Sequence, residues 1–102
     1  MTAYIIWDSA ILNEEGVGNY VNLATQSLAP YSGRFLIQGQ APVAVEEGDW
    51  PEGRMVTMLE FPDMQHARDW YSSADYKKAI AARQGVLDVR AVFVDGKMFG
   101  ES

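Results

Sequence analysis

Residues 54–61, RMVTMLEF, carry apolar side chains on both sides of a segment whose composition predicts a β-strand. Successive side chains of a strand point to opposite faces, so Val56 and Met58 would lie opposite Leu59 and Phe61. Neither apolar face is stable in contact with water. This pattern therefore requires a fold in which both faces of the sheet are covered.

Residues 86–94, VLDVRAVFV, repeat the pattern, with Val92 and Val94 opposite Val89 and Phe93. The helices of one such chain can cover only one of the two faces. An apolar second face of this size normally meets a partner. The sequence therefore predicts a homodimer in which two sheets pack face to face.

Further strands are expected at residues 3–8, 33–39 and 43–47, because these segments are rich in β-branched and aromatic residues or are bounded by glycines. The dipeptide Asp95-Gly96 gives a hairpin signal after the last strand. The residues of the short C-terminal segment KMFGES do not indicate a role for it.

Two helical regions separate the strands. Asn13 offers an N-cap for a helix that ends near Pro30, with apolar residues at helical spacing between them. Asp63 caps the second region, in which Ser73 begins a further helical segment that Gly85 stops. The order β-α-β-β-β-α-β predicts an α+β fold, a ferredoxin-like sandwich with helices on one face of an antiparallel sheet.

Length and charge narrow the choice of partners. The 102 residues make one domain, 1–102, with a single core. The net charge is −6 and no basic run exceeds Lys77-Lys78, so neither nucleic acid nor a membrane surface is an expected partner. There is no cysteine, and the N-terminus lacks the pattern of a signal peptide. We expect a cytoplasmic protein.

The stretch EEGDWPEGR, residues 46–54, places Trp50 among carboxylates between two predicted strands. Pro51 favours an extended Trp50, while Gly48 and Gly53 allow bends, so a loop is expected. Two interpretations of Trp50 remain open. It either folds over the sheet edge or the partner subunit as an anchor, or stacks on a flat ligand at a pocket rim.

Charged residues at strand positions need partners on a half-buried sheet. Arg34 and Glu60 either pair across neighbouring strands, or Arg34 holds a substrate carboxylate with its planar guanidinium. Arg83 lies late in the second helical region. It either interacts with the C-terminus of the helix or pairs with an acidic residue.

His66 is the only histidine of the chain. A general base or a haem ligand would use this residue type, whereas a lone histidine beside Gln65 and Arg68 is typical of a solvated helix surface. No second histidine and no ligand-spaced cluster accompanies it, so no metal site and no cofactor are expected.

Trp70, Tyr71 and Tyr76 form an aromatic group in the second helical region, and their spacing is typical of a core that packs on the sheet. Alternatively, Tyr71 or Tyr76 directs a hydroxyl into a cavity beside Trp7 or Tyr4. The preferred location for a pocket is therefore between the helices and the sheet, with an aromatic lining.

Several segments together resemble the domain-of-unknown-function 1330 family: GRFLIQG, VEEGDWPEGRMVTMLEFP, ARDWYSSADY and AARQ. The resemblance spans nearly the whole chain and implies that the predicted sheets pair as a dimeric α+β barrel. Gln38 stands where the family usually has a basic residue, and Ala74 where a proline is frequent. Related barrels include cofactor-independent monooxygenases, isomerases, decarboxylases and haem-degrading enzymes, so the resemblance implies no single reaction.

These observations leave two main classes of function. In the first, the chain binds a small acidic or aromatic molecule between sheet and helices, as a cofactor-independent enzyme if Arg34 and Glu60 polarise the substrate. In the second, it is a non-catalytic structural or interaction homodimer without a ligand. A haem protein with His66 as ligand is a third class. The candidate ligand-binding residues are Arg34, Trp50, Glu60, His66, Trp70, Tyr71, Tyr76 and Arg83.

Overall fold

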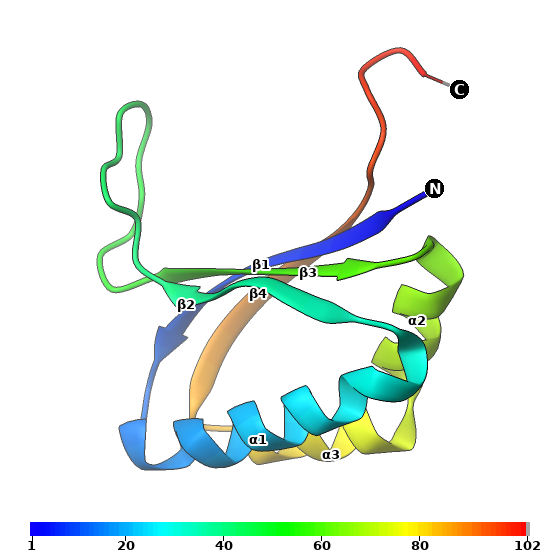
Figure 1. Ribbon diagram of the computed structural model, residues 1–102. Helices are drawn as coiled ribbons and strands as arrows, with labels where there is room; N and C mark the ends of the chain where they lie inside the picture. Colours follow the sequence, from blue (N-terminus) through cyan, green and yellow to red (C-terminus); the bar gives the residue numbers. More distant parts are fainter. Residues whose placement is uncertain (102) are drawn as a thin grey trace.

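The computed structural model describes residues 1–101 and is an α+β sandwich (Figure 1). The strands are β1 (Ala3–Ile11), β2 (Arg34–Gln40), β3 (Met55–Phe61) and β4 (Leu87–Asp95). The helices are α1 (Val17–Leu28), α2 (Met64–Ser72) and α3 (Ala74–Ala82), with 3₁₀ turns η1 (Glu14–Gly16) and η2 (Ala29–Tyr31) on either side of α1. The strands form one antiparallel sheet in the order β2-β3-β1-β4, and the helices cover one of its faces. The predicted ferredoxin-like sandwich is confirmed.

The predicted caps begin the helical regions. Asn13 accepts a hydrogen bond from the Glu15 backbone N–H (3.1 Å) and so starts η1, which leads directly into α1. The Asp63 carboxylate accepts from the backbone N–H of His66 (2.8 Å) at the start of α2, and the Ser73 hydroxyl accepts from Tyr76 (3.1 Å) at the start of α3. Each cap satisfies a backbone N–H that has no partner within the helix.

The strand register assigns the two faces of the sheet. Trp7 lies between Thr57 on β3 and Ala91 on β4, and all three point to the side of the helices. The opposite side is called the outer face below. Its β1, β3 and β4 residues are Tyr4, Ile6, Asp8, Val56, Met58, Glu60, Asp88, Arg90, Val92 and Val94. Val92 is 57% exposed, so the second apolar face predicted from the sequence is present and uncovered in the single chain.

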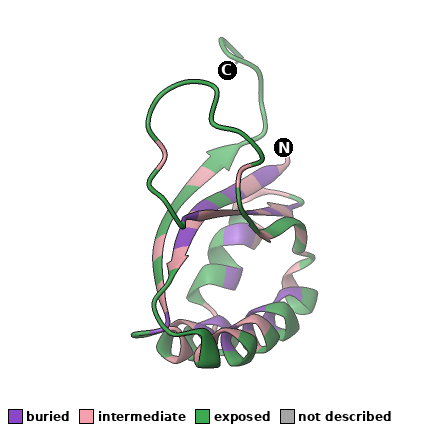
Figure 2. Ribbon diagram, turned by 90° about the vertical axis from the view of Figure 1, so that its left-hand side faces the viewer, coloured by how far each residue is buried: buried purple, intermediate pink, exposed green. Residues whose placement is uncertain are grey.

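The core lies between the sheet and the helices, and Figure 2 shows buried residues both on the strands and on the helices. Trp70 of α2 is 0% exposed and its ring centroid lies 3.9 Å from that of Tyr76 and 5.4 Å from that of Phe61. The indole N–H donates to the Ser27 hydroxyl (2.8 Å), whose own hydrogen goes to the Ala24 carbonyl (2.6 Å). The predicted aromatic core on the second helical region is confirmed.

Two expected elements are absent from the described residues. Residues 43–47 form no strand, because bulges interrupt the β2–β3 ladder after Phe35 and the chain leaves the sheet beyond Gln40. The whole stretch 41–54 is instead one long loop between β2 and β3. Residues 96–101 form no hairpin with β4 and extend away from the sheet, since KMF is too short to build a ladder.

Candidate functional site

A small interior cavity lies between α1 and the helix-facing side of the sheet, with a volume of about 60 Å³. Its lining is Trp7, Ser9, Val17, Tyr20, Val21, Ala24, Phe35, Gln38, Gly39, Met55 and Leu87. Because α1 packs mainly on α3, the edge of the sheet at β2 is left less covered. This position, between helices and sheet and with aromatic walls, is the one expected from the sequence, but no charged residue of the described chain lines the cavity, whereas one or two charged groups were also expected.

Polar groups reach this cavity from β1 and α1. Ser9 is buried, and its hydroxyl makes no side-chain hydrogen bond within residues 1–101. Tyr20, also in the wall, has its hydroxyl 2.8 Å from that of Tyr76. Arg83 donates to the Tyr76 hydroxyl (2.9 Å) and, at 3.4 Å, to that of Tyr20. The interior cavity therefore has one hydroxyl free for a ligand and another held by a buried network.

The tyrosine–arginine network keeps a cation at the interface of α1 and α3. Burial raises the pKa of Tyr76, as do its neighbour Tyr20 and their hydrogen bond, while Arg83 acts to lower it. Tyr76 is therefore a neutral phenol at physiological pH, which lets it both accept from Arg83 and share a proton with Tyr20. This arrangement orients the Tyr20 ring in the cavity wall.

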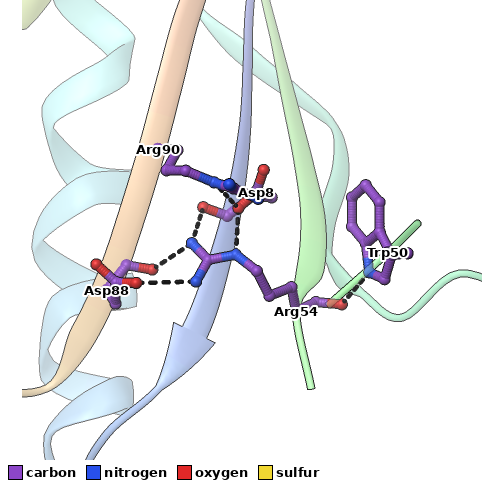
Figure 3. Close-up of polar contacts among 5 residues, drawn as sticks. All are labelled: Asp8, Trp50, Arg54, Asp88 and Arg90. Atoms are coloured by element: carbon purple, nitrogen blue, oxygen red, sulfur yellow. Dashed lines mark hydrogen bonds and ion pairs between the residues drawn. The ribbon is translucent and has the colours of Figure 1, made fainter. Parts of the chain in front are cut away.

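A second polar network lies on the outer face and joins three strands (Figure 3). Arg54, which precedes β3 and is 9% exposed, pairs with Asp8 of β1 and with Asp88 of β4, at 2.8 Å from the latter. Its Nη2 also donates to the backbone carbonyls of Asp8 (3.3 Å) and Asp88 (3.1 Å). Arg90 binds the same Asp8 carboxylate at 3.0 Å. Two guanidinium groups thus share two carboxylates across β1, β3 and β4.

Beside this network the 41–54 loop encloses a larger depression, the outer hollow, of about 350 Å³. Its lining is Ile6, Trp7, Asp8, Trp50, Val56, Arg90, Ala91 and Val92. Trp50 is held by a hydrogen bond from its indole N–H to the Arg54 carbonyl (3.1 Å), as Figure 3 shows. Trp50 is thus bonded within its own loop and lines the outer hollow, and its role as an anchor or as a ligand-stacking residue stays a prediction.

The Asp8 pairs predict a specific loss of stability in acid. Partial burial acts to raise the pKa of Asp8, but hydrogen bonds from Arg90 and Arg54 hold it below the ordinary value of 3.8. A carboxyl whose folded pKa is lowered stabilises the fold above its unfolded pKa, and that contribution disappears as the pH falls through the folded value. We expect the thermal midpoint of the wild type to fall more between about pH 5 and about pH 3 than that of Asp8→Asn. Equal slopes, measured by circular dichroism, would contradict this.

The structure separates the predicted site residues into several places. Arg34 and Glu60 pair across β2 and β3 on the outer face (2.7 Å), as expected, and neither lines the interior cavity. His66 lies on α2 beside Asp63 (2.7 Å), and the hydrogen bonds from His66 hold the pKa of Asp63 below its ordinary value.

The aromatic and basic candidates of the helices are closer together. Trp70 and Tyr76 are stacked in the core, and Tyr71 is half-buried with its ring 5.6 Å from that of Tyr76. Arg83 lies at the C-terminus of α3, one of its two expected alternatives, and its guanidinium donates to the hydroxyls of Tyr76 and Tyr20 rather than to an acidic residue. None of these four residues lines the interior cavity itself.

Apart from Trp7, sequence reasoning missed the residues that line the cavity, and it missed those of the outer network. Ser9, Tyr20, Asp8, Asp88 and Arg90 were not among the candidates. The only available signal was the alternation of strand 86–94, which places Asp88 and Arg90 on the face of Val92. No group of three or more metal-binding side chains occurs within residues 1–101. No helix in the same part of the chain is long and apolar enough to cross a bilayer.

The fold is shared with solved structures described as antibiotic biosynthesis monooxygenases. The chain belongs to the family described as domain of unknown function (DUF1330), whose model matches residues 2–97. No curated protein matches the sequence. The resemblance to this family seen in the sequence is confirmed.

Three solved structures illustrate the similarity. A protein of unknown function from Rhodopseudomonas palustris has a TM-score of 0.76 at 14% identity, over 95% of this chain and 83% of that one. A putative antibiotic biosynthesis monooxygenase from Caulobacter crescentus gives 0.69 at 14% identity, over 95% and 91%. SnoaB, a cofactor-independent oxygenase from Streptomyces nogalater, gives 0.64 at 7% identity, over 98% of both chains. At these identities the similarity shows a common fold.

Proposed function

We propose that this chain binds a small, largely apolar organic molecule, with an aromatic ring and one polar substituent, in the interior cavity. The observation that carries the proposal is the composition of the wall. Trp7, Tyr20 and Phe35 offer aromatic surfaces, and the Ser9 hydroxyl is open to a ligand. Apolar walls with a few placed polar groups are typical of small-molecule sites.

The closed volume of about 60 Å³ is below the roughly 300 Å³ of common ligand sites, so the ligand enters by displacing part of the wall. The side of the cavity at β2 is suited to this displacement. Bulges interrupt β2, Gly39 has a positive φ of 59°, and Val17 and Val21 of α1 face Phe35 there. Movement of α1 away from β2 would enlarge the cavity without breaking the β1–β3–β4 sheet.

We further propose that two copies pair through their outer faces, in agreement with the uncovered apolar residues there. The charged residues of that face already balance one another. Asp8, Glu60 and Asp88 pair with Arg34, Arg54 and Arg90. A face with apolar residues and balanced charge can meet a copy of itself without the repulsion that a net charge of −6 would otherwise cause. This pairing also holds for the alternative function, a non-catalytic homodimer.

Cofactor-independent oxidation of the bound molecule is the reaction to test first, because SnoaB shares the fold and is described as a cofactor-independent oxygenase. Arg34 and Glu60 do not fit the role of polarising the substrate, since they lie on the outer face. The phenol of Tyr20, hydrogen-bonded to Tyr76 and Arg83, belongs to a residue of the cavity wall. A reaction would therefore depend on Tyr20.

The test is a screen of small aromatic and carboxylic compounds by thermal unfolding, followed by titration of each hit. Ser9→Val removes the free hydroxyl and reduces the volume of the cavity, so we expect it to weaken binding at least about tenfold. Its thermal midpoint should stay at or above that of the wild type, because valine suits a strand and fills space. Oxygen consumption with the bound compound, compared between wild type and Tyr20→Phe, measures turnover.

Arg34→Ala is the matched control, since it lies on the other face of the sheet and should bind like the wild type. Loss of binding in Arg34→Ala with retention in Ser9→Val would move the site to the outer face. The absence of any hit in the screen would favour the non-catalytic homodimer.

A further inference from the structure

Two segments without regular structure project from the outer face, the 41–54 loop and the tail, residues 96–101 (Figure 1). The loop ends where β3 begins, and the tail starts where β4 ends. Because β3 and β4 both run antiparallel to β1, these points are at opposite ends of the sheet. The loop therefore projects from one end of the outer face and the tail from the other end.

The direction of the tail is set at its root. The Gly96 N–H donates to the Thr2 carbonyl (2.7 Å) at the start of β1. A Cβ at Gly96 would lie 2.7 Å from the Tyr4 ring and 2.9 Å from that carbonyl, so glycine permits the close approach. Beyond this point the Phe99 side chain is fully exposed. Burial of an aromatic side chain removes roughly 150–250 Å² of surface from water. An exposed aromatic side chain beside an apolar sheet face therefore favours contact with a partner.

The outer hollow lies over the middle of β1 and β4, beside the loop, and matches such a side chain in size and chemistry. Trp50, Ile6, Val56 and Val92 supply apolar walls around about 350 Å³, which exceeds the volume of one phenyl ring. The walls belong to the loop and to β1, β3 and β4, so the hollow opens over β1 and β4 next to the loop.

The symmetry of the dimer determines which part of a second copy reaches the outer hollow. Two sheets facing each other are related by a twofold axis between them. If the axis is perpendicular to the strands, the tail of the second copy lies at the loop end of the first copy, over the β4 side of the first copy's sheet. If the axis runs along the strands, the two loops meet instead.

Charge favours the first arrangement. The loop carries Glu46, Glu47, Asp49 and Glu52, and none of these forms an ion pair within residues 1–101. Loop against loop would bring like charges together, whereas loop against tail brings Lys97 to the acidic loop. Lys97 likewise has no ion pair in the described part of the chain.

We propose that the outer hollow receives Phe99 of a second copy, so that each copy of the homodimer places its tail against the other's 41–54 loop. This inference rests on the proposed pairing of outer faces and adds its direction and its anchor. Trp50 then belongs to a site that is complete only in the dimer, with Lys97 and the acidic loop setting the orientation.

The cysteine-free chain allows a direct test by cross-linking. Val45→Cys marks the loop and Met98→Cys marks the tail, and both side chains are exposed in the single chain. With a short bismaleimide, we expect a mixture of the two variants to give covalent dimers, while each variant alone stays uncross-linked. Cross-linking of Val45→Cys with itself would establish the other axis and overturn the proposal. Sedimentation of the untreated wild type is measured alongside, since a monomer there would instead refute the proposed dimer.

Phe99→Ala tests the anchor. We expect it to raise the dimer dissociation constant at least about tenfold, without changing the circular dichroism spectrum, because the side chain is fully exposed in the single chain. Leu12→Ala is the control, an exposed apolar residue outside the outer face. A dissociation constant for Phe99→Ala within about twofold of the wild type would show that the hollow does not hold this side chain.

Discussion

Trp70→Ala is expected to lower the free energy of unfolding by about 3–5 kcal/mol, which is a large part of the stability of a domain of this size. Trp70 is fully buried and is in contact with the rings of Tyr76 and Phe61. Its removal would leave a cavity between α2 and the sheet. It would also leave the Ser27 hydroxyl without the indole donor that now lies 2.8 Å away.

Urea denaturation followed by circular dichroism measures this effect, at one protein concentration for all variants because the proposed dimerisation would add to the apparent stability. Tyr71→Ala is the control, since the neighbouring ring on the same helix is half-exposed and should cost about 1 kcal/mol. A Trp70→Ala variant no less stable than Tyr71→Ala would contradict the described core.

Arg54→Ala is expected to have the second largest effect, a drop in thermal midpoint several-fold greater than that of Arg34→Ala. Arg54 pairs with Asp8 and Asp88 and also donates to the backbone carbonyls of both, so its loss leaves several acceptors without donors. Hydrogen bonds to Asp88 and Asp8 raise the pKa of Arg54, so it remains charged under all ordinary conditions.

Arg34→Ala removes an arginine of the same outer face that is 69% exposed and pairs only with Glu60. Exposed pairs of this kind contribute about 0–1 kcal/mol. The comparison of the two arginine variants by thermal unfolding at neutral pH therefore measures what burial adds to an ion pair. Similar midpoints for the two variants would mean that the Arg54 network does not hold β1, β3 and β4 together.

The local sequence predicted much of the fold because strand alternation and helix capping depend on residues that are close together in the chain. Alternating apolar residues in 54–61 and 86–94 assigned both faces of their strands, and the caps at Asp63 and Ser73 placed the helix starts. The Arg34–Glu60 pair followed from the need of each charge for a partner on a half-buried sheet. The prediction of a strand at 43–47 was wrong because a strand also needs a partner in register, and the β2–β3 ladder ends at Gln40.

The candidate sites were less predictable because they combine residues that are distant in the chain. Asp8 meets Arg54 and Asp88 only because β1 lies between β3 and β4, an order that no local pattern contains. The interior cavity likewise depends on how far α1 lies from the sheet beside Ser9.

The α+β sandwich, with one face of its sheet left apolar, follows from the amino-acid sequence alone, because alternation and helix capping are properties of neighbouring residues. The position of Trp50, the pairing of charges on the outer face and the place where an uncovered aromatic side chain could bind follow only from the folded chain. Those features depend on strand order, register and the direction of the 41–54 loop and the tail, and these are set by packing over the whole domain.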